Sequence, residues 1–118
     1  MNENLIFETE SVREYPEIIS TAMFSPDFKN NDLIGRTVDV VGYVLREVEL
    51  YDKTVTGVIF FDEDMNSYST ISTVISQQAL EWSKLEKQPD FEKPWPIEFI
   101  EKQNGTHRSY QAKIRFRK

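Results

Sequence analysis

The chain contains no cysteine, and this absence excludes disulfides, thiolate metal sites and a cysteine nucleophile. Histidine is almost absent too, because His107 is the only one and no acidic residue lies near it in the sequence. A catalytic triad or a histidine metal cluster therefore has little to draw on. We accordingly expect a protein that is not an enzyme and that uses no metal or other cofactor.

Long apolar segments are missing as well. No run of residues approaches the length that spans a bilayer, and the N-terminal MNENLIFETE lacks the basic and then apolar order of a signal peptide. We expect no membrane association and a location in the reducing cytoplasm. With 118 residues the chain is long enough for one domain with a modest hydrophobic core.

The acidic and basic residues are unevenly distributed along the chain. The net charge of −6 argues, by itself, against a nucleic-acid partner. Yet the first 101 residues carry −12 and residues 102–118 carry +6, because that last segment holds six lysines or arginines and no acid. The local field decides where a phosphate backbone can lie, so this segment is a candidate DNA contact. The alternative is that its cations keep an exposed edge strand soluble and unpaired.

An acidic turn, DEDMN, partly imitates a calcium-binding loop. Asp62, Asp64 and Asn66 match the first three ligand positions of such a loop. Ser67 then stands where the sharp turn needs glycine, and Thr73 stands where the bidentate glutamate belongs. We therefore predict a solvated turn here and no metal site.

Hydrophobic periodicity predicts an all-β chain with one helix. Alternating residues indicate the strands, and a change of period from 2 to 3.6 indicates a helix of about three to four turns. Strands are predicted at residues 36–51, 54–61, 67–72, 96–102 and 107–118, and the helix begins at residue 72 or 73. This order, β-β-β-α-β-β, is the signature of the five-stranded OB-fold barrel, whose outer face commonly holds single-stranded nucleic acid or oligosaccharide.

The first predicted strand also shows where the sheet bends. A row of valines that includes Val38, Val40 and Val44 has one parity, and Tyr43 has the other. Gly42 at mid-strand predicts a bulge, which lets one strand serve both sheets of a small barrel. Tyr43 is therefore predicted to face away from the valine row.

Residues 1–33 are predicted to form an arm that precedes an OB-fold domain at residues 34–118. LIFET reads as a short strand, and residues 17–24 are apolar enough for a short helix or strand, limited by Pro16 and Pro26. Two roles are open for this arm: it mediates oligomerisation, or it covers a barrel edge.

Aromatic faces that stack on bases and cations that follow phosphates are what single-strand binding requires. Both occur on the predicted outer face and hairpins. The candidate DNA-binding residues are Tyr43, Arg46, Tyr51, Lys53, Phe60, Tyr68, Lys102, His107, Arg108, Lys113 and Arg115. The alternative for the aromatic residues is core packing, since alternation places either Phe60 or Phe61 inside. In the last strand Tyr110, Ala112, Ile114 and Phe116 are predicted to face inward, and Lys113, Arg115 and Arg117 outward.

The stretch TVTGVIFFDEDMNSYSTISTVISQQALEWSKL (Thr54 to Leu85) resembles the small single-stranded-DNA-binding proteins of Gram-positive phages. The likeness is greatest to those of protein-primed Bacillus phages and looser to proteins of conjugative plasmids. An arm with Phe24, Phe28 and Lys29 ahead of the first strand is also similar. The resemblance implies an OB-fold that binds single-stranded DNA without sequence preference during phage or plasmid replication, in the host cytoplasm. It further implies replication proteins or further copies of the chain as partners, with Tyr68 as the best-matching aromatic.

Two functions therefore remain in competition. The first is non-enzymatic binding of single-stranded DNA. The second is a phage-encoded protein-binding module or inhibitor of a host protein, whose acidic body imitates nucleic acid or docks on a basic protein.

Overall fold

The strands predicted from residue 36 onward are all present in the computed structural model. It describes residues 4–115, and the side chains of residues 5–29, 32–103, 105, 106 and 108–115. The elements are β1 (Asn4–Glu8), α1 (Glu10–Arg13), α2 (Pro16–Phe24), α3 (Asn30–Leu33), β2 (Thr37–Leu50), β3 (Lys53–Asp62), β4 (Ser67–Thr70), α4 (Thr73–Trp82), β5 (Trp95–Asn104) and β6 (His107–Ile114). The fold is mainly β, and the strand pairs are antiparallel.

The predicted count of five strands and one helix is wrong, although the order β-β-β-α-β-β is confirmed from β2 to β6. The additional strand is β1, and the additional helices are α1 to α3, all within the predicted arm. These elements are short, so tertiary contacts stabilise them more than their own sequence pattern does. Residues 17–24, left open between helix and strand, lie in α2.

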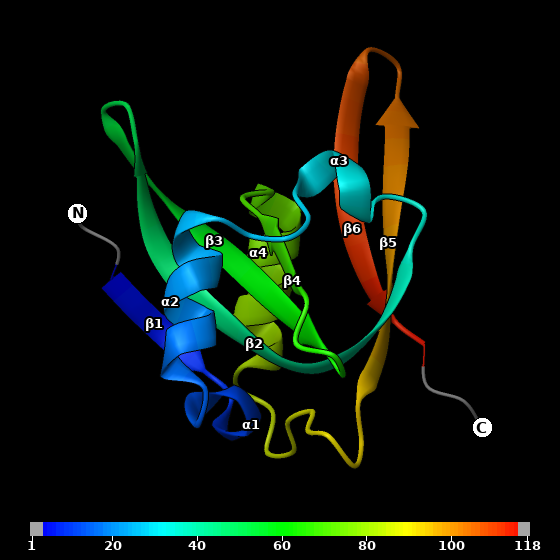
Figure 1. Cartoon of the computed structure of the whole chain (residues 1–118). Coiled ribbons are helices and arrows are strands. Elements are labelled where there is room, and N and C mark those ends of the chain that lie inside the picture. Colours follow the sequence, from blue (N-terminus) through cyan, green and yellow to red (C-terminus); the bar gives the residue numbers. More distant parts are fainter. Residues whose placement is uncertain (1–3, 116–118) are drawn as a thin grey trace.

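The sheet runs in the order β4-β3-β2-β5-β6, with β1 paired to β2 (Figure 1). β2 serves two neighbours on one side, because its start pairs with β5 and its later part pairs with β1. The register against β3 shifts between Val40 and Gly42, so Val41 is the extra residue of a bulge. The bulge predicted at Gly42 is thus confirmed, and it is where β2 passes from one neighbour to the other.

β4 and β6 are the two end strands of the sheet order, and among the described residues they do not pair with each other. The helix α4 forms hydrogen bonds with both β3 and β6. Its Ser76 Oγ donates to the Thr56 carbonyl of β3 at 2.8 Å. Its Gln78 Nε2 donates to the Ala112 carbonyl of β6 at 2.8 Å, and the Ala112 amide donates to Gln78 Oε1 at 2.9 Å. A primary amide presents the same donor and acceptor as a peptide group. One side chain therefore pairs with the Ala112 peptide groups at the edge of β6, where a closed barrel would have a strand.

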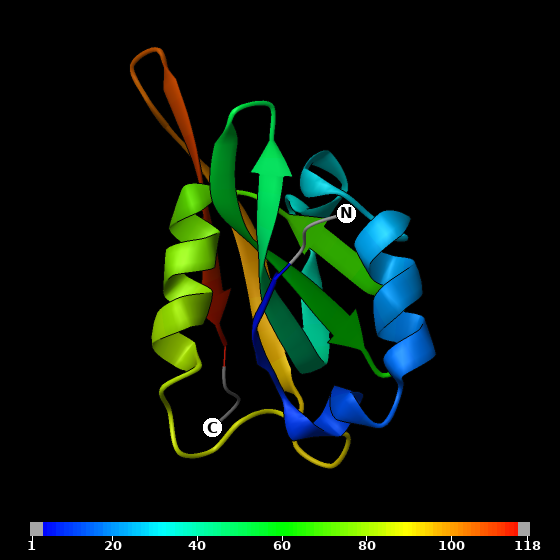
Figure 2. The ribbon, with the colours of Figure 1, turned by 90° about the vertical axis from the view of Figure 1, so that its left-hand side faces the viewer.

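The sheet has a hydrophobic core on each face, with α4 on one side and α2 on the other (Figure 2). The core under α4 is rich in aromatic residues, and the core under α1 and α2 is mostly aliphatic. The first contains Leu33, Val38, Val40, Tyr43, Leu45, Val58, Phe60, Tyr68, Ile75, Ala79, Trp95, Ile97, Phe99 and Ala112. The second contains Val12, Ile19, Ala22, Val41, Val44, Ile59 and Phe61. The middle of the sheet is consequently covered on both faces.

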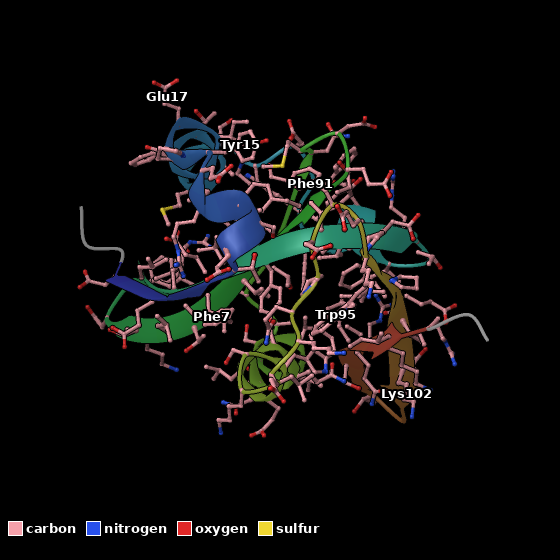
Figure 3. All side chains as sticks on the ribbon, turned by 90° about the horizontal axis from the view of Figure 1, so that it is seen from below. Phe7, Tyr15, Glu17, Phe91, Trp95 and Lys102 are labelled. Atoms are coloured by element: carbon pink, nitrogen blue, oxygen red, sulfur yellow. The ribbon has the colours of Figure 1, made fainter. Side chains whose placement is uncertain are left out.

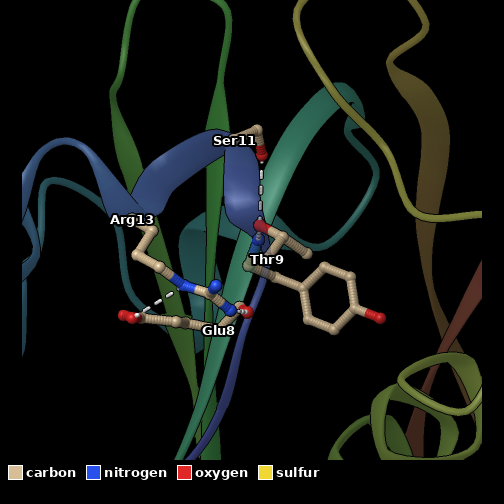
Figure 4. A network of polar contacts seen from close by, with 5 residues as sticks. Glu8, Thr9, Ser11 and Arg13 are labelled. Carbon is tan, nitrogen blue, oxygen red and sulfur yellow. Dashed lines mark hydrogen bonds and ion pairs between the residues drawn. The ribbon is translucent and has the colours of Figure 1, made fainter.

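The arm is attached to the sheet by a polar network as well as by its core residues (Figure 4). The Tyr43 amide donates to Thr9 Oγ1 and the Thr9 amide donates to the Tyr43 carbonyl, both at 3.1 Å. Ser11 Oγ donates to the Val41 carbonyl at 2.5 Å. Arg13 Nε lies 3.4 Å from Glu8 Oε1 across the start of α1. The arm covers one face of the sheet at the bulge.

Candidate nucleic-acid interface

The predicted site residues separate into a buried and an exposed group. Buried are Tyr43, Arg46, Phe60 and Tyr68, and exposed are Tyr51, Lys53, Lys102, Arg108, Lys113 and Arg115. His107 lies at the start of β6, but its side chain is outside the described residues, as are Phe116 and Arg117 altogether. The alternation predicted for the last strand is confirmed at residues 112–115, where Ala112 is buried, Ile114 is half-buried, and Lys113 and Arg115 are exposed.

The prediction that Tyr43 and Phe60 are available to stack on DNA is wrong. Both are completely buried in the core under α4, with ring centroids 6.0 Å apart. The bulge at Val41 shifts the alternation of β2 by one residue. As a result Tyr43 joins Val40 on the inner face, while Val44 turns to the face covered by α1 and α2.

The Tyr43 hydroxyl holds the connection between α4 and β5 in place. It donates to Gln88 Oε1 at 2.6 Å, and Gln88 Nε2 donates to the carbonyls of Trp82 and Leu85 at 2.8 and 2.9 Å. Burial raises the pKa of the Tyr43 hydroxyl well above its ordinary value. Tyr43 is therefore a neutral structural tyrosine.

Tyr68 already stacks on an aromatic ring of the chain itself. Its ring and that of Phe28 are nearly parallel, at 12°, with centroids 4.8 Å apart. The guanidinium carbon of Arg36 lies 4.7 Å from the Phe28 centroid. Phe28 thus occupies the ring face on which a base would stack, and the predicted role of Tyr68 as an open stacking surface is wrong.

The surroundings of Tyr68 depend on residues far away in the sequence. Asp27 Oδ2 accepts from the amide and the hydroxyl of Ser67 at 2.8 and 3.1 Å. The Tyr68 hydroxyl donates to Asp62 Oδ2 at 2.7 Å. Burial first, and then the Asp62 carboxylate, raise the pKa of Tyr68 to about 12. Asp27 and Ser67 are 40 residues apart, so no local sequence signal indicates these contacts.

The prediction that Arg46 lies on an open face and contacts DNA is also wrong, because this residue is only 5% exposed. It lies on β2 between Leu5 of β1 and Gly57 of β3. The predicted sheet did not include β1, so the sequence analysis placed Arg46 on an uncovered face. The covered guanidinium is not a surface phosphate contact in this structure.

Tyr51 is fully exposed at the tip of the β2–β3 hairpin. With Asp52 it forms the two-residue turn between Leu50 and Lys53, and its φ is +54°. Such turns favour glycine, asparagine or aspartate where φ is positive, because a bulky side chain is strained there. At the tip of the β5–β6 hairpin the equivalent positive φ, +62°, belongs to Gly105. Tyr51 therefore destabilises this turn relative to glycine or asparagine.

The exposed cations among the predicted site residues are of two kinds. Arg115 Nε donates to Glu98 Oε1 at 2.9 Å, and Arg108 Nε lies 3.5 Å from Glu101 Oε1. The predicted lysines, in contrast, form no ion pair with another described residue. They are Lys53, Lys102 and Lys113. These ammonium groups are available to an anion without breaking an existing pair.

The two hairpins project from the same end of the molecule, as two perpendicular views show (Figures 1 and 2). The β2–β3 hairpin brings Tyr51 and Lys53, and the β5–β6 hairpin brings Lys102 and Arg108. An aromatic ring and several cations are thereby presented at one end.

The opposite end is acidic and carries an exposed aromatic pair (Figure 3). The rings of Tyr15 and Phe91 are 6.1 Å apart, and they are 38% and 41% exposed. They line a cleft of about 440 Å³ together with acidic residues of α1 and its C-cap and of the connection before β5. These acids are Glu10, Glu14, Asp90 and Glu92.

In the part of the chain that the structure describes, no group of three or more histidine, aspartate or glutamate side chains is arranged to hold a metal ion. Nor is any helix there long and apolar enough to cross a membrane. In the acidic turn, Asp62 Oδ1 accepts from the amides of Asp64 and Asn66 at 3.0 and 2.9 Å. This carboxylate shapes its own turn.

Comparisons of this chain with protein-family models, with curated proteins and with solved structures returned no match.

Proposed function

We propose that the chain is an OB-fold protein that binds single-stranded DNA without sequence preference and catalyses no reaction. The sheet order β4-β3-β2-β5-β6, with α4 between β4 and β5, supports this fold. In that architecture the first and last hairpins commonly clasp the ligand. Here these are the β2–β3 and β5–β6 hairpins, which share one end of the molecule.

The observation that carries the proposal is the strained, fully exposed Tyr51. Backbone strain that the turn itself does not require points to a functional constraint on the side chain. A base stacked on an aromatic ring contributes about 1–3 kcal/mol, which outweighs a strain of about 1 kcal/mol once DNA is bound. Tyr51 is thus the predicted aromatic residue that keeps the stacking role in this proposal, whereas Tyr43, Phe60 and Tyr68 are buried.

The exposed cations supply the phosphate contacts in this proposal. Lys53, Lys102 and Lys113 contact phosphates directly. Arg108 and Arg115 contribute less, because each must first leave its glutamate. The acidic remainder of the chain repels the phosphate backbone and so directs DNA to the two hairpins.

The biological setting of the proposal rests on the resemblance noted in the sequence. It is phage or plasmid DNA replication in the host cytoplasm, with replication proteins or further copies of the chain as partners. Its first requirement is DNA binding, which a direct experiment measures.

Anisotropy of a labelled oligo-dT, titrated with the protein at about 50 mM salt, tests the proposal. We expect binding that weakens with salt, with a log–log slope near −0.7 per phosphate neutralised. Replacing Tyr51 by asparagine should weaken binding by about tenfold, whereas Tyr51→Phe should retain it. Lys102→Gln and Lys113→Gln should each make the slope shallower by about 0.7, and Lys84→Gln, at an ion pair on the outside of α4, should not.

A protein-binding module is the second candidate, favoured by the acidic cleft around Tyr15 and Phe91. Exposed aromatic rings surrounded by carboxylates suit a basic protein segment. Absence of any oligo-dT affinity at about 50 mM salt would remove the first proposal and leave this one.

A further inference from the structure

The connection between α4 and β5 forms an open, mainly apolar cavity that lies apart from both hairpin tips. Its volume is about 490 Å³, within the range of about 300–1,000 Å³ that small-molecule sites occupy. Apolar parts of Leu85, Pro94 and Trp95 form much of its lining. The cavity is therefore large enough for a one- or two-ring molecule or a short acyl chain.

Core contacts hold the walls of this cavity in place. Trp95 is 7% exposed and packs edge-on against Trp82, with centroids 6.2 Å apart and an angle of 86°. Its centroid is also 6.2 Å from that of Tyr43. The Tyr43 hydroxyl in turn holds Gln88, another lining residue, at 2.6 Å. The cavity is consequently preformed, which lowers the entropy lost when a ligand binds.

The polar groups of the lining favour an apolar ligand body. Gln88 Nε2 donates to the carbonyls of Trp82 and Leu85, so both hydrogens of this amide are already used. A nucleobase would bury several donors and acceptors here with few groups to satisfy them, and unsatisfied polar groups are costly. A hydrocarbon body carries no such cost.

The charges at the rim favour an anionic head group. Lys87 and Lys93 line the cavity and are exposed, and neither forms an ion pair with another described residue. Glu86 also lines it, so the charged lining residues sum to one positive charge. The flexible ammonium groups of these two lysines can meet a carboxylate or sulfonate.

We propose that this cavity binds a small amphipathic organic anion. Its apolar body lies against Leu85, Pro94 and Trp95, and its carboxylate or sulfonate lies between Lys87 and Lys93. This site is independent of the proposed DNA contacts, which lie on the hairpins.

Fluorescence titration of the full chain with 1-anilinonaphthalene-8-sulfonate tests the site. Trp82 and Trp95 are the two tryptophans of the chain, so energy transfer from them to the dye reports that the dye is bound. We expect saturation at one dye per chain. Octanoate and 1-naphthoate should displace the dye, and the neutral 1-naphthalenemethanol should do so at least fivefold more weakly.

Matched variants locate the binding. The double variant Lys87→Gln and Lys93→Gln should weaken dye affinity by about tenfold, and Leu85→Ser by about fivefold or more. Phe24→Ser removes another exposed apolar side chain and should change nothing. All these positions are exposed, and circular dichroism melting checks that each variant remains folded.

Three outcomes would overturn the proposal. They are dye fluorescence that does not saturate, loss of affinity in Phe24→Ser equal to that in Leu85→Ser, and equal competition by the neutral and anionic naphthalenes. Oligo-dT binding should be the same in Leu85→Ser and the unaltered protein, so this site and the DNA site stand or fall separately.

Discussion

The middle and the tip of the β2–β3 hairpin are built from the same two strands, yet their surroundings are opposite. In the middle, Tyr43 and Phe60 on one face and Val44 and Ile59 on the other are completely buried. At the tip, Tyr51 is fully exposed. The alternation of side chains continues throughout, but α4 and the arm cover only the middle. Which partners a strand residue meets is thus decided by what packs on the strand.

The largest expected effect separates the two regions by stability. Phe60→Ala should lower the free energy of unfolding by about 3–5 kcal/mol, because it leaves a cavity among packed aromatic rings. Tyr51→Ala, the same kind of truncation at the tip, should change it by less than about 0.5 kcal/mol. Urea unfolding followed by circular dichroism measures both. Similar losses in the two variants would contradict the difference in burial.

A substitution at Gly42 tests how closely the arm packs on the middle of the β2–β3 hairpin. A Cβ at this position would lie 2.5 Å from Thr9 Oγ1, 2.5 Å from Val12 Cγ1 and 2.6 Å from Ser11 Oγ. Gly42→Ala should therefore destabilise the protein by about 1–3 kcal/mol.

A matched glycine on the neighbouring strand is the control. At Gly57 the nearest atoms to an added Cβ are 3.4 Å away, an ordinary contact. Gly57→Ala should change the unfolding midpoint little or raise it slightly. If both alanine variants unfold at the same denaturant concentration, the arm does not pack at Gly42 as described.

Alkaline pH tests the burial of the Tyr68 hydroxyl. Its pKa is raised from 10.0 to about 12 in the folded protein, so between these values the unfolded chain loses a proton that the folded chain keeps. The stability contributed is fully present below pH 10 and is lost as pH rises from 10 towards 12. Tyr68→Phe should lose less stability over this window when unfolding is measured at each pH. If Tyr68→Phe loses as much stability over this window as the unaltered protein, the loss would be assigned to Tyr43, whose pKa is also raised.

A smaller effect, and one of opposite sign, is expected for a substitution at the tip that relieves its strain. Tyr51→Asn should raise the free energy of unfolding by up to about 1 kcal/mol, because asparagine tolerates the positive φ better. Tyr51→Phe keeps the strain and should leave stability unchanged. Differential scanning calorimetry of the two variants decides this, and a destabilised asparagine variant would show that the tyrosine supports the turn.

The positions of the strands and of α4 could be predicted because local signals define them. Ser72 at the N-cap accepts from the Ile75 amide, and the change of period there marks the start of α4. Gly42 marked the bulge correctly. The prediction left out the consequence of that bulge, which places Tyr43 in the same core as Val40 and places Val44 in the core on the opposite face.

The candidate site was harder to predict because distant segments decide it. Phe28 stacks on Tyr68, and β1 lies beside Arg46, although neither contact leaves a pattern in the strands concerned. Only positions on the two hairpins stayed exposed as predicted, since turns and alternating charges are local features. The strain at Tyr51 was invisible in the sequence, because it is a property of the backbone.

The pairing between α4 and the β6 edge depends on the side chain of one residue, Gln78. The pairing of a whole strand with a sheet edge depends on many residues, so a single substitution weakens it only in part. Here one substitution at Gln78 removes both hydrogen bonds. An alanine there would leave the outward peptide group of Ala112 free to pair with another chain. A substitution at this one position would therefore expose an unpaired stretch of sheet edge, the kind of edge on which another strand can pair.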